Sequence, residues 1–359
     1  MLPISVQDVE MGYIKQEKHP LEYEYLQPEH LKGFDSYKYN CVDNSPLSVY
    51  VSHPFWNWLV EFYPRTWVPN VLTLVGWGFV MAGFFIEGFL DYRIDRNSDG
   101  SVNPIPDWFW FAAALCTFLG HTLDGTDGKQ SRRIGAIDHG LDSWSTVPFT
   151  ITIFSIFGRG RYSISSVELL CVLISTQIVF FTTHWEKYNT GIMFLSWAYD
   201  GLVIVYMWTY FVGYQWFHFD LFEKLKQPSL LAGIRPAWPV LILFGSSIYW
   251  AVASPTNVID ADPRFFFFCM GTVFSNITCR LIIAQMASTV CDIYNLTLGI
   301  YLSTIALSFY SPAHELLILR LSTLVITSLH LHYGICVRQL CRHFKIYAFD
   351  VSYLQNRKE

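Results

Sequence analysis

The sequence predicts an all-α polytopic membrane protein. Of its 359 residues, 52% are hydrophobic and only 15% are charged, which leaves too little polar surface for a soluble protein of this length. The mean hydropathy of +0.29 agrees. Because a helix needs about 20 apolar residues to cross a bilayer, apolar runs of nearly that length mark the membrane spans. We predict nine, at 69–91, 106–123, 143–160, 166–183, 191–214, 237–254, 264–288, 293–310 and 315–336.

An N-terminal region precedes the first predicted span. Its first 20 residues carry too many charges for a signal peptide, so we expect the N-terminus to stay in the cytosol. Residues 46–64, PLSVYVSHPFWNWLVEFYP, are apolar and aromatic but are interrupted by polar side chains. Two alternatives stay open for this segment. It forms either an interfacial helix with Trp56 and Trp58 at headgroup depth or a helix packed on the bundle.

Composition and motifs also exclude several kinds of binding site. The eight cysteines form no CxxC pair and are scattered through predicted spans, which argues against a disulfide framework or a zinc site. The formal net charge is −5 and no basic tract is present, so we expect no nucleic acid partner. The sequence also lacks the glycine patterns of Walker and Rossmann nucleotide sites.

Charged residues gather between the second and third predicted spans. Residues 121–144 read HTLDGTDGKQSRRIGAIDHGLDSW, with Asp124 and Asp127 three positions apart and Asp138 and Asp142 four apart. On a helix, each spacing projects both carboxylates from one face. Two antiparallel helices joined by a short loop would therefore bring the two pairs into one cavity.

Four carboxylates this close cannot all stay ionised without a positive charge among them. Hard divalent cations prefer oxygen ligands, and Mg²⁺ favours carboxylates that it shares with substrate phosphates. Arg132 and Arg133 could donate to phosphate oxygens in a bidentate manner. A solvated loop is the alternative, but charges at a membrane boundary are costly to insert and so favour a functional site.

This segment resembles the signature of the CDP-alcohol phosphotransferase family, Asp-x-x-Asp-Gly-x-x-Ala-Arg followed by Gly-x-x-x-Asp-x-x-x-Asp. HPFWN, PNVLTLVG, SIFGRG, HWEKYNTG and HLHYG resemble the ethanolaminephosphotransferase branch, and the resemblance covers about 20 to 355. That family carries ten spans, so we expect a bundle of about nine to ten transmembrane helices with an N-terminal interfacial helix.

The resemblance implies an enzyme that transfers phosphoethanolamine from CDP-ethanolamine to diacylglycerol or alkyl-acylglycerol, giving phosphatidylethanolamine and CMP. It implies a multi-pass protein of the endoplasmic reticulum or Golgi membrane, in contact with membrane lipid. The resemblance leaves open whether the protein forms a homodimer. It implies that Arg132 holds the diphosphate, that Gly128 allows close approach of the CDP moiety, and that Asn70 contacts the CDP-alcohol. The implied ligands of Mg²⁺ or Mn²⁺ are Asp124, Asp127, Asp138 and Asp142.

His139 matches the residue that accepts a proton in this family. An imidazole that titrates near neutrality suits the removal of a proton from a lipid hydroxyl. Two alternatives stay open: Asp142, which is the base in other branches, and the His184–Glu186 pair in HWEKYN.

The expected organisation has four parts. A cytosolic N-terminal segment with the interfacial helix spans 1–66, and the catalytic helices span 67–215. Further transmembrane helices follow at 216–336, and a tail occupies 337–359. Nine spans would place this tail opposite the N-terminus, whereas its basic residues favour the cytosolic side. Asn276, Arg280 and Gln285 form a polar stripe that lines a lipid path, a dimer seam or a buried network.

The chain departs from the family pattern between its aspartate pairs. Asp127 and Asp138 are 11 positions apart, where the family has about 18, and Ser131 replaces the alanine. If the first helix ran on to Arg133, it would carry the chain ~9 Å past the site, and the remaining residues could span at most ~17 Å. We therefore expect either an earlier helix end or a later start of the next helix.

The short link leaves other functions open. One alternative is a catalytically impaired membrane isoform, and another is a transferase that accepts both choline and ethanolamine. A transporter is a third class, but the sequence shows no pair of broken helices, and its aspartates cluster at one membrane face.

Overall fold

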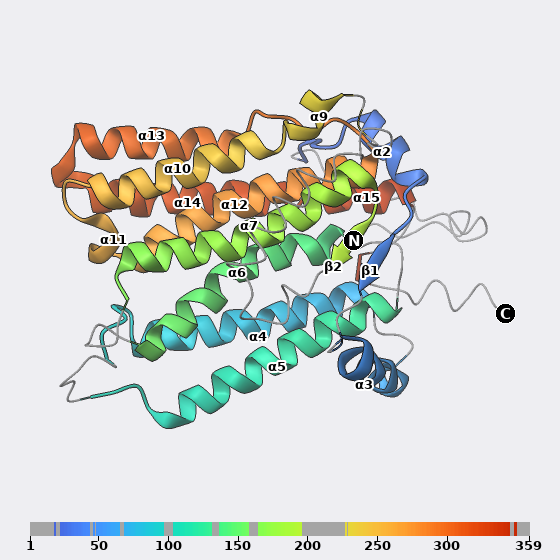
Figure 1. Cartoon of the computed structure of the whole chain (residues 1–359), viewed down its shortest axis with the longest axis horizontal. Coiled ribbons are helices and arrows are strands. Elements are labelled where there is room, and N and C mark those ends of the chain that lie inside the picture. Colours follow the sequence, from blue (N-terminus) through green and yellow to red (C-terminus); the bar gives the residue numbers. More distant parts are fainter. Residues whose placement is uncertain are drawn as a thin grey trace.

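The computed structural model describes residues 18, 22–43, 46, 48–64, 68–96, 103–130, 136–157, 164–195, 227, 229–344 and 348–349. Within these residues, the side chains of 128–130, 136–138, 156–157, 194–195 and 230 lie outside the description. Eight described helices of 15 residues or more lie side by side as one bundle (Figure 1). They are α4 (Pro69–Leu90), α5 (Asp107–Gln130), α6 (Ala136–Phe157), α7 (Ser166–Thr190), α10 (Ala237–Ala253), α12 (Pro263–Ala287), α13 (Leu296–Tyr310) and α14 (Glu315–Tyr333).

Short elements connect and flank the bundle. Two three-residue strands, β1 (Cys41–Asp43) and β2 (Met193–Leu195), pair in parallel and bring the N-terminal region beside the end of α7. The other short elements are helical. They are α2 (Pro28–Asp35), η1 (Ser48–Ser52), α3 (His53–Leu59), η2 (Val60–Phe62), α9 (Leu230–Ile234), α11 (Val258–Ala261), η5 (Pro312–His314) and α15 (Cys336–Phe344).

The helices confirm an all-α membrane protein, apart from the small β1–β2 pairing. Five helical segments among the described residues are long and apolar enough to cross a bilayer. The predicted count of nine to ten spans is not confirmed, although eight of the nine predicted runs coincide with bundle helices. The five candidate spans are Pro69–Leu90, Ser166–Thr190, Leu231–Ala253, Pro263–Ala287 and Pro312–Phe344.

The span predicted at 191–214 is wrong where it begins. Gly191 adopts a left-handed conformation with φ of 79° and ends α7, and Met193–Leu195 is then extended in β2. A glycine takes this conformation without strain because it has no Cβ. Residues 196–214 lie outside the described part of the chain.

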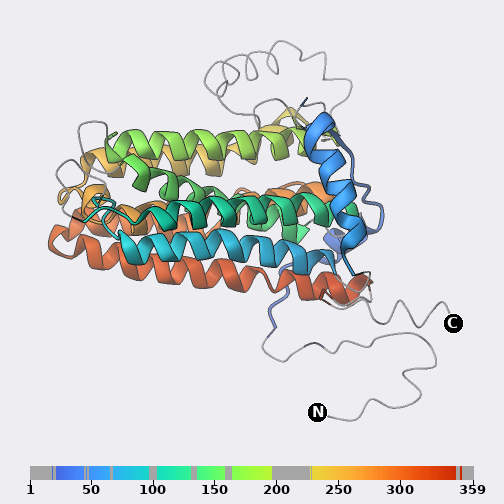
Figure 2. The ribbon, with the colours of Figure 1, turned by 90° about the horizontal axis from the view of Figure 1, so that it is seen from below.

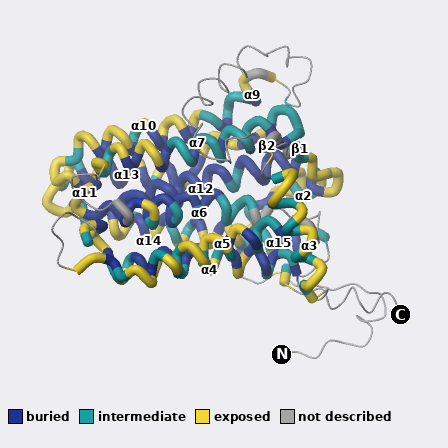
Figure 3. The backbone as a smooth tube through the Cα atoms, turned by 60° about the horizontal axis from the view of Figure 1, so that its bottom comes forward, coloured by how far each residue is buried: buried dark blue, intermediate teal, exposed yellow. Residues whose placement is uncertain are grey.

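Helix α12 forms the centre of the bundle, and 83% of its candidate span is buried (Figure 3). It packs against α6, α7, α10 and α14. The outer helices instead expose large apolar side chains, among them Phe85, Phe111, Val252 and Leu324. Exposed apolar side chains on so many outward faces fit a lipid environment, where apolar surface does not have to be buried.

The first and last described segments of the chain meet at the same end of the bundle. Gln339 Oε1 on α15 accepts hydrogen bonds from Tyr25 N at 2.8 Å and Leu26 N at 3.0 Å, and Arg342 pairs with Glu22. The tail therefore begins on the side of the N-terminal region, which agrees with its basic composition and contradicts the side implied by nine spans.

Helix α3 lies across this same end of the bundle, with its axis turned away from those of the long helices (Figure 2). Its Trp56 ring rests against α5 near Gly125 and contacts His121 edge-on, 5.5 Å between ring centres, while Trp58 is 55% exposed. The segment thus combines packing on the bundle with an exposed aromatic face. Its depth in the membrane stays a prediction.

Candidate active site

Two glycines bring α4 and α5 into close contact beside the aspartates. A Cβ added at Gly76 would lie 3.1 Å from the carbonyl oxygen of Gly120, and one added at Gly120 would lie 3.0 Å from Val80. Such small residues let two helix backbones approach closely. The approach sets Thr73 of α4 against α5, where its hydroxyl donates a hydrogen bond to Asp127 Oδ2.

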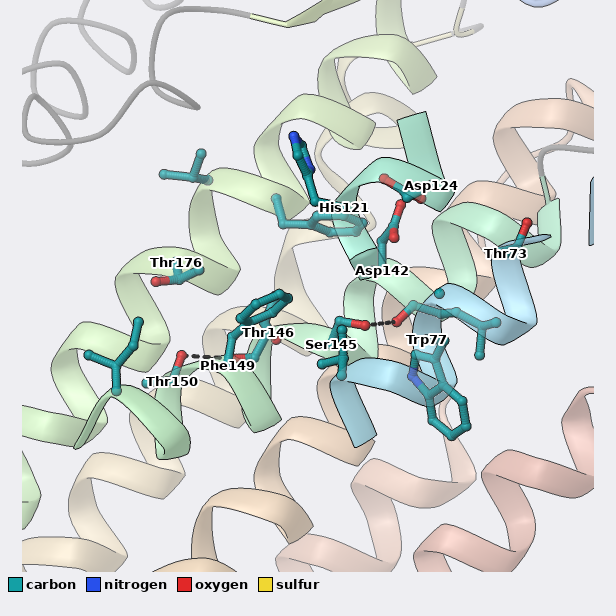
Figure 4. Close-up of a pocket in the computed structure, with 17 residues that line it drawn as sticks. Thr73, Trp77, His121, Asp124, Asp142, Ser145, Thr146, Phe149, Thr150 and Thr176 are labelled. Atoms are coloured by element: carbon teal, nitrogen blue, oxygen red, sulfur yellow. Dashed lines mark hydrogen bonds between the residues drawn. The ribbon is translucent and has the colours of Figure 1, made fainter. Parts of the chain in front are cut away.

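A cavity of about 440 Å³ opens between α4, α5, α6 and α7. Asp124 and Asp142 line it, and Figure 4 shows their carboxylates turned toward each other. Asp142 also interacts electrostatically with Asp127. The rest of the lining is mostly apolar and includes Trp77 and Phe149, with hydroxyl side chains such as that of Ser145. The cavity therefore joins an acidic end to an apolar interior.

The structure thus places Asp124 and Asp142 on one cavity, with Asp127 near enough to interact electrostatically with Asp142. Asp138 stands in the first turn of α6 next to His139, but its side chain is outside the description, as is that of Gly128 in the last turn of α5. Arg132 lies outside the described residues. Among side chains that are described, no group of three acidic, histidine or cysteine residues is close enough to hold a metal ion.

Helix α5 is described as far as Gln130, and α6 is described from Ala136. Both alternatives for the short link stay predictions. Residues 131–135 themselves are outside the described ranges.

Three of the candidate bases, His139, Asp142 and His184, lie in one cluster beside the cavity. His139 Nδ1 is 3.8 Å from Asp142 Oδ2, too long for a hydrogen bond but close enough for an ion pair if the imidazole is protonated. The His139 ring meets the His184 ring edge-on, with 5.0 Å between centres. Geometry alone therefore leaves His139, Asp142 and His184 as neighbours rather than as separate sites.

Sequence reasoning missed Lys187 and two tyrosines next to this cluster. Lys187 is only 1% exposed, and its Nζ donates a hydrogen bond of 3.1 Å to Tyr37. The same Nζ lies 4.2 Å from the ring centre of Tyr39, which stacks on His139. Burial raises the pKa of Tyr37 to about 12, so it stays a neutral phenol that can accept from the ammonium. Nothing in the local sequence around Tyr37 or Tyr39 indicates this long-range contact.

Asn70 takes a position that its predicted role did not anticipate. Its Nδ2 donates a hydrogen bond of 2.9 Å to the carbonyl oxygen of Ala348, and the residue is buried. It thereby ties the start of α4 to the C-terminal tail at the same end of the bundle as the cavity. Contact with the CDP-alcohol stays a prediction.

Asn276 belongs to a buried polar network, one of the alternatives for its stripe. It accepts a 3.0 Å hydrogen bond from Asn295 and lies 3.4 Å from His330 Nδ1. His330 in turn meets Ser275 at 3.3 Å, and Ser275 meets Ser143 of α6 at 2.7 Å. This chain of contacts fixes the rotation of α6, which carries His139 and Asp142.

Comparison with known proteins places the chain in a family. Ethanolaminephosphotransferase 1 of Homo sapiens is 37% identical over 378 residues, which cover 92% of this chain and 95% of that protein. An uncharacterized CDP-alcohol phosphatidyltransferase class-I family protein of Dictyostelium discoideum is 28% identical over 371 residues, covering 90% and 93%. Choline/ethanolaminephosphotransferase 1 of Arabidopsis thaliana is 23% identical over 319 residues, covering 73% and 79%.

An acidic cavity inside a bundle of membrane helices is the setting for a membrane-embedded transferase. The chain belongs to the CDP-alcohol phosphotransferase family, as its similarity to the human protein over most of both lengths shows. No family model matches it.

Proposed function

We propose that the protein is an ethanolaminephosphotransferase. It transfers phosphoethanolamine from CDP-ethanolamine to the hydroxyl of diacylglycerol or alkyl-acylglycerol, and it releases phosphatidylethanolamine and CMP. One observation carries the proposal: Asp124 and Asp142 face each other at the head of a cavity whose lining is otherwise largely apolar. Such a cavity suits a reaction between a charged diphosphate and a lipid. The human relative that covers most of the chain is named for this activity.

The oxygen donors of these carboxylates suit a hard divalent cation, although no group of three described side chains lies close enough to hold one. Asp142 lies within the electrostatic reach of Asp124 and Asp127, and all of their donor atoms are oxygens. Asp124, Asp127, Asp138 and Asp142 would hold Mg²⁺ or Mn²⁺. When bound, such an ion neutralises the diphosphate and stabilises the charge that develops on the departing CMP.

The residues of the chain would divide the remaining work. In the transfer, the lipid oxygen forms a bond to the phosphorus of phosphoethanolamine, and the bond from that phosphorus to the CMP oxygen breaks. His139 would accept the lipid proton, and Asp142, 3.8 Å from its Nδ1, would stabilise the imidazolium. Gly128, Arg132 and Asn70 would contact the CDP moiety as the family resemblance implies. Trp77 and Phe149 would contact the lipid.

The proposed catalytic unit is 67–215, because α4 to α7 supply the cavity lining. Residues 1–66 and 337–359 would flank it on one membrane side, and 216–336 would support it. We propose the endoplasmic reticulum or Golgi membrane as its location, in line with the family resemblance.

A second candidate is a catalytically impaired isoform. The sequence feature that favours it is the separation of only 11 positions between Asp127 and Asp138, where the family pattern has about 18. A link shortened relative to the family pattern would displace Arg132 and Asp138 from positions that bind the diphosphate and metal. Such a protein would bind CDP-ethanolamine without transferring its headgroup.

A radiolabel assay distinguishes these candidates. Purified full-length protein would be incubated with diacylglycerol, Mg²⁺ or Mn²⁺, and labelled CDP-ethanolamine or CDP-choline. We expect labelled phosphatidylethanolamine, with CDP-choline a poorer donor. Comparable use of both donors would instead indicate dual specificity. Binding of CDP-ethanolamine with no product at any metal concentration would support the impaired isoform.

A further inference from the structure

The N-terminal residues 22–43, here called the strap, are fixed across the end of the bundle that holds the cavity. Their first part is held by α15, through the bonds from Tyr25 N and Leu26 N to Gln339. Their middle part packs on α12, where a Cβ added at Gly33 would lie 1.7 Å from the carbonyl oxygen of Ala287. The strap is therefore seated on the helices and does not merely lead into them.

The last part of the strap is held in register with the end of α7. Met193 N donates a hydrogen bond of 3.0 Å to the carbonyl oxygen of Asn40, and Cys41 then pairs with Met193 in the β1–β2 ladder. Only Gly191 and Ile192 separate β2 from α7. Tyr39, the residue before Asn40, is consequently held at a set position relative to α7.

Tyr39 is placed between a cation and the proposed base. Lys187 Nζ of α7 lies 4.2 Å from its ring centre, within the range of a cation–π contact. The His139 ring of α6 lies 6.1 Å away and is nearly parallel, with 23° between the planes. Tyr39 is nonetheless 45% exposed, so its side chain is not needed to fill the core.

The His139 ring is thus bounded by side chains from three different parts of the chain. Tyr39 of the strap stacks on it, His184 of α7 meets it edge-on at 5.0 Å with 64° between the planes, and Asp142 of its own helix approaches Nδ1. Its side chain is only 15% exposed. An imidazole has two free side-chain torsions, and these neighbours restrict both.

We propose that Tyr39 is a positioning residue for the transfer reaction. Its ring, held by Lys187 and by the β1–β2 pairing, fixes the orientation in which His139 meets the lipid hydroxyl. The inference rests on the proposed function, in which His139 is the base. It makes the strap part of the active site, although the strap precedes every residue of the family signature.

The test compares Tyr39→Ala with Tyr39→Phe in the full-length protein. Phe keeps the stacked ring and loses only the hydroxyl, whereas Ala removes the ring. We expect Tyr39→Ala to lower kcat about tenfold, the scale of one aromatic pair, with little change in the KM for CDP-ethanolamine. Tyr39→Phe should stay near the parent. Tyr23→Ala is the matched control, because Tyr23 is a 62% exposed tyrosine on the same strap whose ring meets the Tyr25 ring edge-on.

A double substitution separates positioning from general structure. If Tyr39 acts through His139, Tyr39→Ala should cause no further loss in a His139→Ala background. An equal loss in both backgrounds would overturn the proposal, as would a full effect of Tyr39→Phe.

A measurement that does not need turnover tests the stacking of Tyr39 on His139 even if the proposed function is wrong. Diethyl pyrocarbonate modifies accessible imidazoles, and peptide mass spectrometry can follow its reaction with His139. We expect several-fold faster modification in Tyr39→Ala, and no change in Tyr39→Phe or Tyr23→Ala. Unchanged modification in Tyr39→Ala would refute the stacked geometry even if the protein transferred no headgroup. Loss of transfer in the parent alone would refute the proposed function.

Discussion

The two ends of the bundle both hold buried acidic side chains, but the side chains that contact these carboxylates differ. At the end away from the cavity, Glu87 of α4 forms an ion pair with Arg264 of α12, and Asp262 forms one with Arg320 at 2.6 Å. At the cavity end, a hydroxyl donates to Asp127 and an imidazole lies near Asp142. Arginine carries a permanent charge and satisfies a carboxylate fully, while a hydroxyl or a neutral imidazole does not neutralise it.

This difference separates structural carboxylates from those that we propose to be functional. Arg264 also donates to the carbonyl oxygens of Asp91 and Tyr92, so its whole guanidinium serves to join α4 to α12. Asp124 and Asp142 instead face a cavity with room for a ligand. The sequence shows carboxylates at both ends of the bundle, and only the side chains that contact them in the structure distinguish the two groups.

The largest expected effect is on activity at the cavity end. Asp124→Asn or Asp138→Asn should abolish metal-dependent transfer, because each change removes a negative charge that would face a cation. Folding should be kept, since removing one of several repelling carboxylates relieves repulsion. The measurement is radiolabel transfer, with thermal unfolding as the control. Activity above about a tenth of the parent would argue against a metal site of four carboxylates.

His139→Ala should lower turnover by roughly 10²- to 10⁴-fold, the usual effect of losing a general base. Binding of CDP-ethanolamine should change little, because the base contacts the lipid hydroxyl. Steady-state kinetics together with equilibrium binding would check both points. A larger loss in His184→Ala would move the base assignment to α7.

Lengthening the link between α5 and α6 should improve the placement of the proposed metal ligands at the cavity end. Inserting about seven residues, with a proline-containing turn and a Gly-x-x-x-Asp spacing before Asp138, should raise activity. A misplacement of ligands near 1 Å can cost on the order of 10²-fold, so the gain could approach that factor. The fold should tolerate the insertion, because loop length has a small thermodynamic cost. Equal transfer by the parent and the lengthened chain, at matched expression, would show that the short link already builds the site.

The far end should show the opposite behaviour. Glu87→Gln leaves Arg264 without its buried partner and should destabilise the fold by about 3–5 kcal/mol, while the specific activity of the folded fraction is kept. The double change Glu87→Leu with Arg264→Met should cost less, because no charge is then left buried. Denaturant unfolding in detergent would measure both. A fall in specific activity that tracks neither stability nor folded fraction would break the distinction between the two ends.

Much of the fold and of the candidate site could be predicted from local sequence patterns within single helices. Apolar runs predicted the bundle helices, and the spacing of Asp124 and Asp127 predicted that they share a helix face. The contact of Tyr39 with His139 could not be predicted, because it depends on pairing between strands about 150 positions apart. The hydrogen bond from Thr73 to Asp127 likewise depends on how closely Gly76 and Gly120 let two helices approach. The start of the span predicted at 191–214, where Met193–Leu195 is a strand, shows that apolar composition alone does not distinguish a strand from a helix.

The contacts between the strap and α15 have a consequence for the order in which the protein assembles during synthesis. The ribosome synthesises the strap first, whereas Gln339 and Arg342, which hold its beginning, are synthesised near the end. Membrane helices inserted in between must all be in place before these partners meet. The beginning of the strap is therefore secured last, and a nascent chain that stalls before α15 would carry the aspartates before α15 holds that part of the strap.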